Sequence, residues 1–165
     1  MMSKIVVEAE SHMQEPAPRR RETHHLSISE TICESVAHAA QDLDMQAIAV
    51  FTETGTTARL ISKYRPKSAI FGFATRHTVC ARMNLMWGVQ PVRSDATTNA
   101  EDMLVRAERL MTKRQAVQPG DVVAIVAGTR STTGSTNFMR LHVVGGKEEA
   151  EKITVRPERR KVPGR

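Results

Sequence analysis

Residues 52–57 have the composition of a phosphate-binding loop. They read Thr-Glu-Thr-Gly-Thr-Thr, with four threonine hydroxyls that can hydrogen-bond an anion and a glycine that permits a tight turn. An apolar run precedes the segment and a helical pattern follows it, so backbone N–H groups at the helix start face the loop. Threonine and glycine are also ordinary capping and turn residues, and the segment has neither a Walker lysine nor a G-x-G-x-x-G pattern. The candidate phosphate-binding residues are Thr52, Thr54, Gly55, Thr56 and Thr57.

A second polar segment, residues 128–136, reads Gly-Thr-Arg-Ser-Thr-Thr-Gly-Ser-Thr. Its nine residues make it longer than most hairpin loops, which favours a functional role. Arg130 adds a permanently charged fork of donors that suits phosphate or carboxylate. The alternative is a solvated polar connection without a ligand. The candidate residues are Gly128, Thr129, Arg130, Gly134, Ser135 and Thr136.

Both segments follow the carboxyl ends of predicted strands. In open α/β sheets, ligands gather at that edge, so the two segments together favour a shared anion site more strongly than either does alone. Glu53 is the only carboxylate in either segment, and its charge would repel a phosphate.

The remaining titratable residues do not form a recognisable catalytic or metal-binding pattern. His24 and His25 fall in a charged linker, and His77 and His142 have no partner at a suggestive spacing. Cys33 and the chain's other cysteine are far apart and lack metal-ligand spacing. The sequence therefore predicts no catalytic residue and no metal site.

Helical and strand patterns alternate between these segments. Apolar periodicity and capping signals predict helices that begin after Ser27-x-x-Glu30, near Ala58, near Thr75 and after Thr98-x-x-Glu101. Short apolar runs predict strands at 48–51, 69–73, within 88–93, at 122–127 and at 138–144. The third strand is interrupted by Pro91. This alternation predicts an α/β three-layer sandwich with a mostly parallel five-stranded sheet, its last strand antiparallel to the fourth.

Composition limits the chain to one main globular body. Its 165 residues are 40% apolar and 25% charged, and no stretch approaches the roughly 20 apolar residues of a membrane-spanning helix. The first residues do not form a secretory signal, and the two separated cysteines fit a reducing compartment, so we expect a cytoplasmic protein without a membrane partner. We divide the chain into a helix and charged linker (1–25), an α/β domain (26–145) and a basic tail (146–165) that we expect to be disordered.

The net charge of +6 does not indicate nucleic-acid binding. The tail from Lys147 contributes +3 (seven Lys or Arg, four Glu), and residues 26–146 contribute the other +3 (thirteen basic, ten acidic). Aromatic residues make up only 4% of the chain, whereas nucleic-acid surfaces interleave them with clustered basic residues. We therefore expect no nucleic-acid partner.

Five segments carry motifs in a characteristic order: Glu22–Glu30, Ala49–Arg59, Ser62–Pro66, Gln118–Asp121 and Gly134–Arg140. Together they resemble the C-terminal domain of pyruvate kinase. The resemblance runs from about residue 1 to residue 144, and residues 1–13 look like the last helix of that family's catalytic barrel.

The resemblance implies a regulatory rather than a catalytic role for this chain. Pyruvate kinases transfer a phosphoryl group from phosphoenolpyruvate to ADP with Mg²⁺ and usually K⁺, in a barrel whose lysine, metal-binding carboxylates and glycine-rich helix start are not found here. The family's C-terminal domain binds a phosphorylated allosteric effector and contributes a subunit interface of the tetramer. By resemblance, residues 52–57 hold the effector phosphate and residues 128–136 close over it. The implied partners are the effector, the catalytic barrel and further copies of the chain, and this chain alone should be inactive.

Two departures from the family pattern limit the effector. Members that bind fructose 1,6-bisphosphate commonly have a non-acidic residue at the position of Glu53 and a basic residue at the position of Thr56. Both changes lower the positive charge, which disfavours a sugar bisphosphate and leaves a sugar monophosphate or AMP compatible. Two other hypotheses stay open: a stand-alone phosphometabolite-binding protein, and a structural interaction domain with a vestigial pocket.

Overall fold

The computed structural model describes residues 27–97, 99–128 and 136–146, together with Ile5 and Glu8. Apart from Ile5 and Glu8, the predicted N-terminal helix and linker lie outside the described residues, as does nearly all of the basic tail. The three-part division of the chain stays a prediction.

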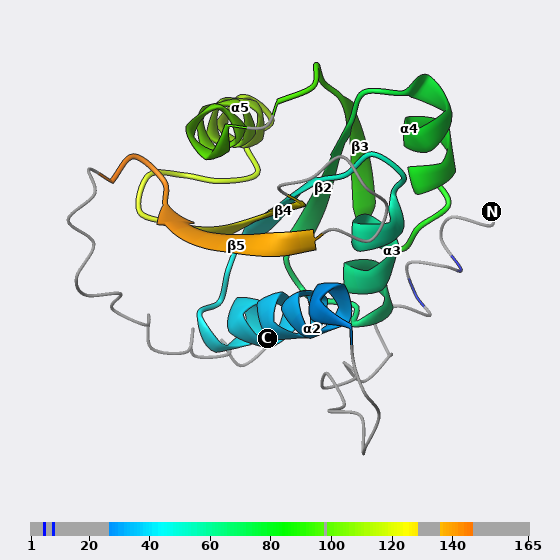
Figure 1. Ribbon diagram of the computed structural model, residues 1–165. Coiled ribbons are helices and arrows are strands. Elements are labelled where there is room, and N and C mark those ends of the chain that lie inside the picture. Colours follow the sequence, from blue (N-terminus) through cyan, green and yellow to red (C-terminus); the bar gives the residue numbers. More distant parts are fainter. Residues whose placement is uncertain (1–4, 6–7, 9–26, 98, 129–135, 147–165) are drawn as a thin grey trace.

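A five-stranded sheet with the order β3-β2-β1-β4-β5 forms the middle of the structure (Figure 1). Neighbouring strands are parallel except β4 and β5, which are antiparallel. The predicted topology, with one antiparallel strand at the end of a parallel sheet, is confirmed. The strands are β1 (Ala47–Phe51), β2 (Ala69–Ala74), β3 (Val89–Arg93), β4 (Val122–Gly128) and β5 (Thr136–Val143).

Helices cover both faces of this sheet, which gives three layers. In Figure 1, α5 lies on one side of the sheet and α2 and α3 lie on the other. Each face of the sheet has its own hydrophobic core, and alternate residues of β1 point into different cores. Ile48 and Val50 pack with residues of α2, α3 and α4, whereas Ala47 and Ala49 pack with residues of α5. A strand buried on both faces needs apolar residues at every position, and this produces the continuous apolar runs of the sequence. The helices are α2 (Ile28–Asp42), α3 (Thr56–Lys63), α4 (His77–Met83) and α5 (Ala100–Lys113).

The two predicted capping boxes have different outcomes. Ser27 caps α2 as predicted, because its hydroxyl accepts from the Glu30 N–H (3.2 Å) and the Glu30 carboxylate accepts from the Ser27 N–H (3.1 Å). The prediction that Thr98 and Glu101 form a capping box at the start of α5 is wrong. Asn99 is the cap of α5, and its side-chain oxygen accepts from the Glu101 N–H at 3.0 Å. Asparagine is a strong cap residue, and in this chain it stands one position closer to the helix than Thr98, which lies outside the described residues.

Pro91, which interrupts the predicted third strand, lies in the edge strand β3. Proline cannot donate a backbone hydrogen bond, but an edge strand has a neighbour on only one side. Next to β3, Gly72 of β2 allows Met83 of α4 to pack closely: a Cβ atom at Gly72 would lie 2.7 Å from the Met83 sulfur. The glycine thus sets how near α4 comes to the sheet.

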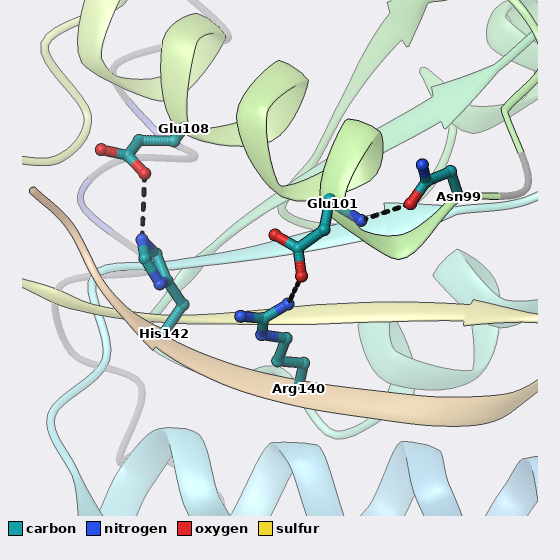
Figure 2. Close-up of polar contacts among 5 residues, drawn as sticks. All are labelled: Asn99, Glu101, Glu108, Arg140 and His142. Carbon is teal, nitrogen blue, oxygen red and sulfur yellow. Dashed lines mark hydrogen bonds and ion pairs between the residues drawn. The ribbon is translucent and has the colours of Figure 1, made fainter. Parts of the chain in front are cut away.

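Two polar side-chain contacts connect β5 to α5, which covers one face of the sheet (Figure 2). Arg140 pairs with Glu101, and His142 Nε2 lies 2.9 Å from a carboxylate oxygen of Glu108. The second Glu108 oxygen accepts from the Gly145 N–H at 3.1 Å. As the sequence indicated, His142 has no partner at a motif spacing: Glu108 is 34 positions away along the chain. The pair holds the end of β5 against α5.

Candidate functional site

The two polar segments begin at the same edge of the sheet. β1 and β4 are adjacent and parallel, with Val50 opposite Val126 close to their carboxyl ends. The segment after β1 therefore begins beside the segment after β4, although about seventy residues separate them in the sequence. This is the arrangement on which the prediction of a shared site depended.

Hydrogen bonds within residues 52–56 fix the shape of the first segment. The Thr52 N–H donates to the Phe73 carbonyl (3.0 Å), which extends the pairing of β1 with β2, and the Thr52 hydroxyl accepts from the Gly55 N–H (2.9 Å). The hydroxyls of Thr54 and Thr56 lie 3.0 Å apart. A hydroxyl has one donor and two acceptor sites, so these threonines first shape the loop and keep further hydrogen-bonding capacity for a ligand.

Gly55 places the start of α3. Its φ of +84° is in the left-handed region that favours glycine, and a Cβ there would meet Met83 Cγ at 3.4 Å and Val79 Cγ1 at 3.5 Å. The first bond of α3 runs from the Arg59 N–H to the Gly55 carbonyl (3.0 Å). The amides of Thr57 and Ala58 come before it and have no carbonyl partner inside the helix. The helix start therefore offers donors, and a partial positive charge, to an anion.

A buried hydrogen bond joins the two segments. The hydroxyls of Thr57, in the first turn of α3, and of Thr136, the first residue of β5, lie 2.7 Å apart, and both residues are buried. Thr136 is opposite Gly128, where a register shift marks the end of the β4–β5 pairing. The ends of the second segment are thus fixed beside the end of the first segment, where α3 starts.

The N-terminal half of α2 supports this junction. The Ser29 hydroxyl donates to the Thr136 carbonyl (3.3 Å), and the Cys33 thiol donates weakly to the Thr57 carbonyl (3.9 Å). Burial, with a smaller contribution from the Glu30 carboxylate, raises the pKa of the Cys33 thiol to about 12. The thiol therefore stays protonated at neutral pH and can act as this donor.

One residue at the site was missed by the sequence reading. Arg76, just before α4, donates from its guanidinium to the Glu53 carbonyl at 3.1 Å, and both residues are exposed. No local motif marks Arg76. Its position could have been inferred only from the topology. Because β2 lies parallel to β1, the two residues after β2, Thr75 and Arg76, lie beside the loop that follows β1.

The predicted site residues divide into two groups. Thr52, Thr54, Gly55, Thr56 and Thr57 lie together at the β1–α3 junction, and Gly128 and Thr136 lie beside them. Thr129, Arg130, Gly134 and Ser135 lie outside the described residues. No group of three or more His, Cys, Asp or Glu side chains that could hold a metal ion occurs within the described ranges. None of the helices found there has both the length and the apolar character needed to cross a bilayer.

The fold and this junction define a class: a mostly parallel α/β domain whose candidate ligand edge lies at the carboxyl ends of β1 and β4. Comparison with known proteins identifies the family. Residues 30–142 match the family described as "Pyruvate kinase, alpha/beta domain". The chain belongs to the pyruvate kinase C-terminal α/β domain family, as its sequence motifs indicated.

Curated relatives support the same assignment. The chain is 38% identical over 120 residues to a pyruvate kinase of Bacillus licheniformis, a match covering 73% of the chain and 20% of the relative. It is 37% identical over 120 residues to a pyruvate kinase of Lactobacillus delbrueckii subsp. bulgaricus (72% of the chain, 20% of the relative). It is 39% identical over 112 residues to one of Staphylococcus aureus strain USA300 (67% and 19%). The chain therefore corresponds to about a fifth of the length of these relatives.

The Thr57–Thr136 bond predicts a distinct pattern of stabilities. Thr57→Val or Thr136→Val alone should lower the free energy of unfolding by roughly 1–3 kcal/mol, because each leaves one buried hydroxyl without its partner. The double variant Thr57→Val/Thr136→Val should recover most of that loss, since both partners become apolar groups of the same shape. Urea unfolding of the four proteins measures the coupling, and additive losses in the double variant would contradict it.

Proposed function

We propose that this chain is the regulatory and oligomerisation domain of a pyruvate kinase, and that it binds a phosphorylated effector at the β1–α3 junction. The catalytic part of such an enzyme transfers a phosphoryl group from phosphoenolpyruvate to ADP, in glycolysis in the cytoplasm. In this proposal the Mg²⁺ and K⁺ of that reaction belong to the catalytic barrel, and the chain alone is inactive. Its role is to change the activity of the barrel when the effector is bound.

The observation that carries this proposal is the hydrogen bond between Thr57 and Thr136. Its 2.7 Å length brings the start of α3 and the end of the 128–136 segment into contact. An anion at the start of α3 would then have amides and hydroxyls of residues 52–57 on one side. Gly128 and Thr136, the described ends of the second segment, would lie beside it. A ligand held by both segments can alter the position of β5, which is the kind of change that effector binding requires.

The charges at the junction favour a ligand with one phosphate. Glu53 is exposed in the first segment and lowers the local positive potential. The guanidinium of Arg76 donates to the Glu53 carbonyl. We therefore propose a sugar monophosphate or AMP as the effector class in preference to a sugar bisphosphate.

The proposed oligomerisation role is supported by the surface of β5. β5 is an edge strand, and on it Met139 is 36% exposed and Leu141 is 38% exposed. An edge strand with apolar side chains is a ready template for pairing with another strand. A second copy of this chain is the partner that we propose for this surface.

The effector proposal predicts that Thr54→Ala weakens binding. Inorganic phosphate, AMP and sugar monophosphates should raise the melting temperature of the wild-type chain, because a ligand that binds only the folded state stabilises it. Thr54→Ala should reduce the binding free energy by roughly 1–3 kcal/mol, the usual range for a hydrogen bond to a charged group. Thr54→Ser keeps the hydroxyl and is the matched control. A wild type that responds to none of these compounds would support a purely structural domain instead.

The charge argument predicts that Glu53→Lys broadens the ligand range. This reversal should admit fructose 1,6-bisphosphate with affinity on the order of tenfold above that of the wild type, and added salt should reduce the gain. Glu53→Gln, which removes the charge without reversing it, should give an intermediate affinity. Isothermal titration calorimetry measures the series, and equal rejection of the bisphosphate by all three proteins would show that charge does not limit the site.

The interface proposal predicts that Leu141→Lys shifts the chain toward monomers. Analytical ultracentrifugation of the wild type should show a concentration-dependent dimer, and a lysine on β5 should oppose pairing at that edge. Leu85→Lys is the matched control, because Leu85 is 89% exposed and follows α4, which packs against β2 and β3 at the opposite edge of the sheet from β5. Equal sedimentation of all three proteins would argue against the β5 surface.

A further inference from the structure

The loop after β1 is fixed from the α4 side by one hydrogen bond from a side chain. Arg76 Nη2 donates to the Glu53 carbonyl oxygen at 3.1 Å. Arg76 precedes α4 directly, and the packing of Gly55 near Val79 and Met83 shows that the same helix lies against the loop. The contact joins the segment after β1 to the segment after β2.

This hydrogen bond sets the orientation of one peptide group. In a trans peptide the C=O and the following N–H point in opposite directions. While Arg76 holds the Glu53 carbonyl, the Thr54 N–H faces away from the guanidinium. The next N–H groups are constrained as well, because Gly55 N donates to the Thr52 hydroxyl at 2.9 Å and Thr56 N approaches the Thr54 hydroxyl at 3.5 Å. The direction of the Thr54 amide therefore depends on Arg76.

We propose that Arg76 is a positioning residue of the effector loop, which it holds with the Thr54 amide oriented toward the anion. This inference rests on the proposed function. Arg76 acts through the Glu53–Thr54 peptide, and its charge also offsets that of the exposed Glu53 carboxylate. Loss of the guanidinium frees the peptide to rotate, so that the loop must be reordered each time an anion binds.

The test compares three variants with the wild type, using inorganic phosphate as the probe. Arg76→Met removes the donor and the charge but keeps the length of the side chain. Arg76→Lys keeps the charge and one donor, so it should rescue most of the function. Arg82→Met removes an equal charge from an exposed position on the same helix and controls for net charge. ¹⁵N-HSQC spectra give the position of the Thr54 amide signal without ligand and the phosphate affinity on titration.

We expect Arg76→Met to shift the Thr54 amide signal in the ligand-free protein and to weaken phosphate binding roughly tenfold. Arg76→Lys should stay within about threefold of the wild type, and Arg82→Met should match it closely. If the wild type binds phosphate and Arg76→Met binds it equally well, the role of Arg76 is overturned while the proposed function stands. If the wild type shows no response to phosphate at any loop amide, the proposed function fails and the inference fails with it.

Discussion

The parallel pairing of β1 with β4 is the constraint on which the candidate site depends. Ile48 and Val50 of β1, together with Ala124 and Val126 of β4, are buried in one core cluster, so the register of the two strands is fixed by packing on that face as well as by backbone hydrogen bonds. A slip of one residue would turn these side chains to the other face of the sheet. Because the register is fixed, the segments after the two strands start side by side.

Buried polar contacts then tie the two segments to each other and to the layer beneath them. The Thr57–Thr136 pair replaces the water that each hydroxyl loses on burial, and Ser29 and Cys33 of α2 donate to the carbonyls of the same two residues. A conformational change in either segment would therefore alter contacts with α3, β5 and α2 together. In the proposed function, this shared junction is how an anion at one loop would influence the strand that carries the proposed interface.

The sequence predicted the fold well because strands that are buried on both faces need apolar residues at every position, and such runs are visible in the sequence. β1, β2 and β4 are continuous apolar runs, and their order along the chain, alternating with helices, allows few sheet topologies. Errors appeared where the structure depends on a choice between neighbouring polar residues. Asn99 and Thr98 are both good caps, and local pattern alone did not separate them.

Contacts between residues distant in the chain were harder to predict. His142 and Glu108 are 34 positions apart and Arg76 and Glu53 are 23 apart, so no motif spacing reveals either pair. The Arg76 contact could have been inferred from the parallel order of β1 and β2, which brings the residues after both strands together. The His142 contact required knowledge of which face of α5 lies over β5 (Figure 2).

The most direct measurement of the central claim is anomalous diffraction from crystals of this chain soaked in tungstate, a heavy analogue of phosphate. The account predicts the strongest peak at the start of α3, within hydrogen-bonding distance of amides in residues 54–58 and beside Thr136. Peaks only at other surfaces, or apolar side chains filling the space between the two segments, would contradict the claim that this edge of the sheet binds an anion.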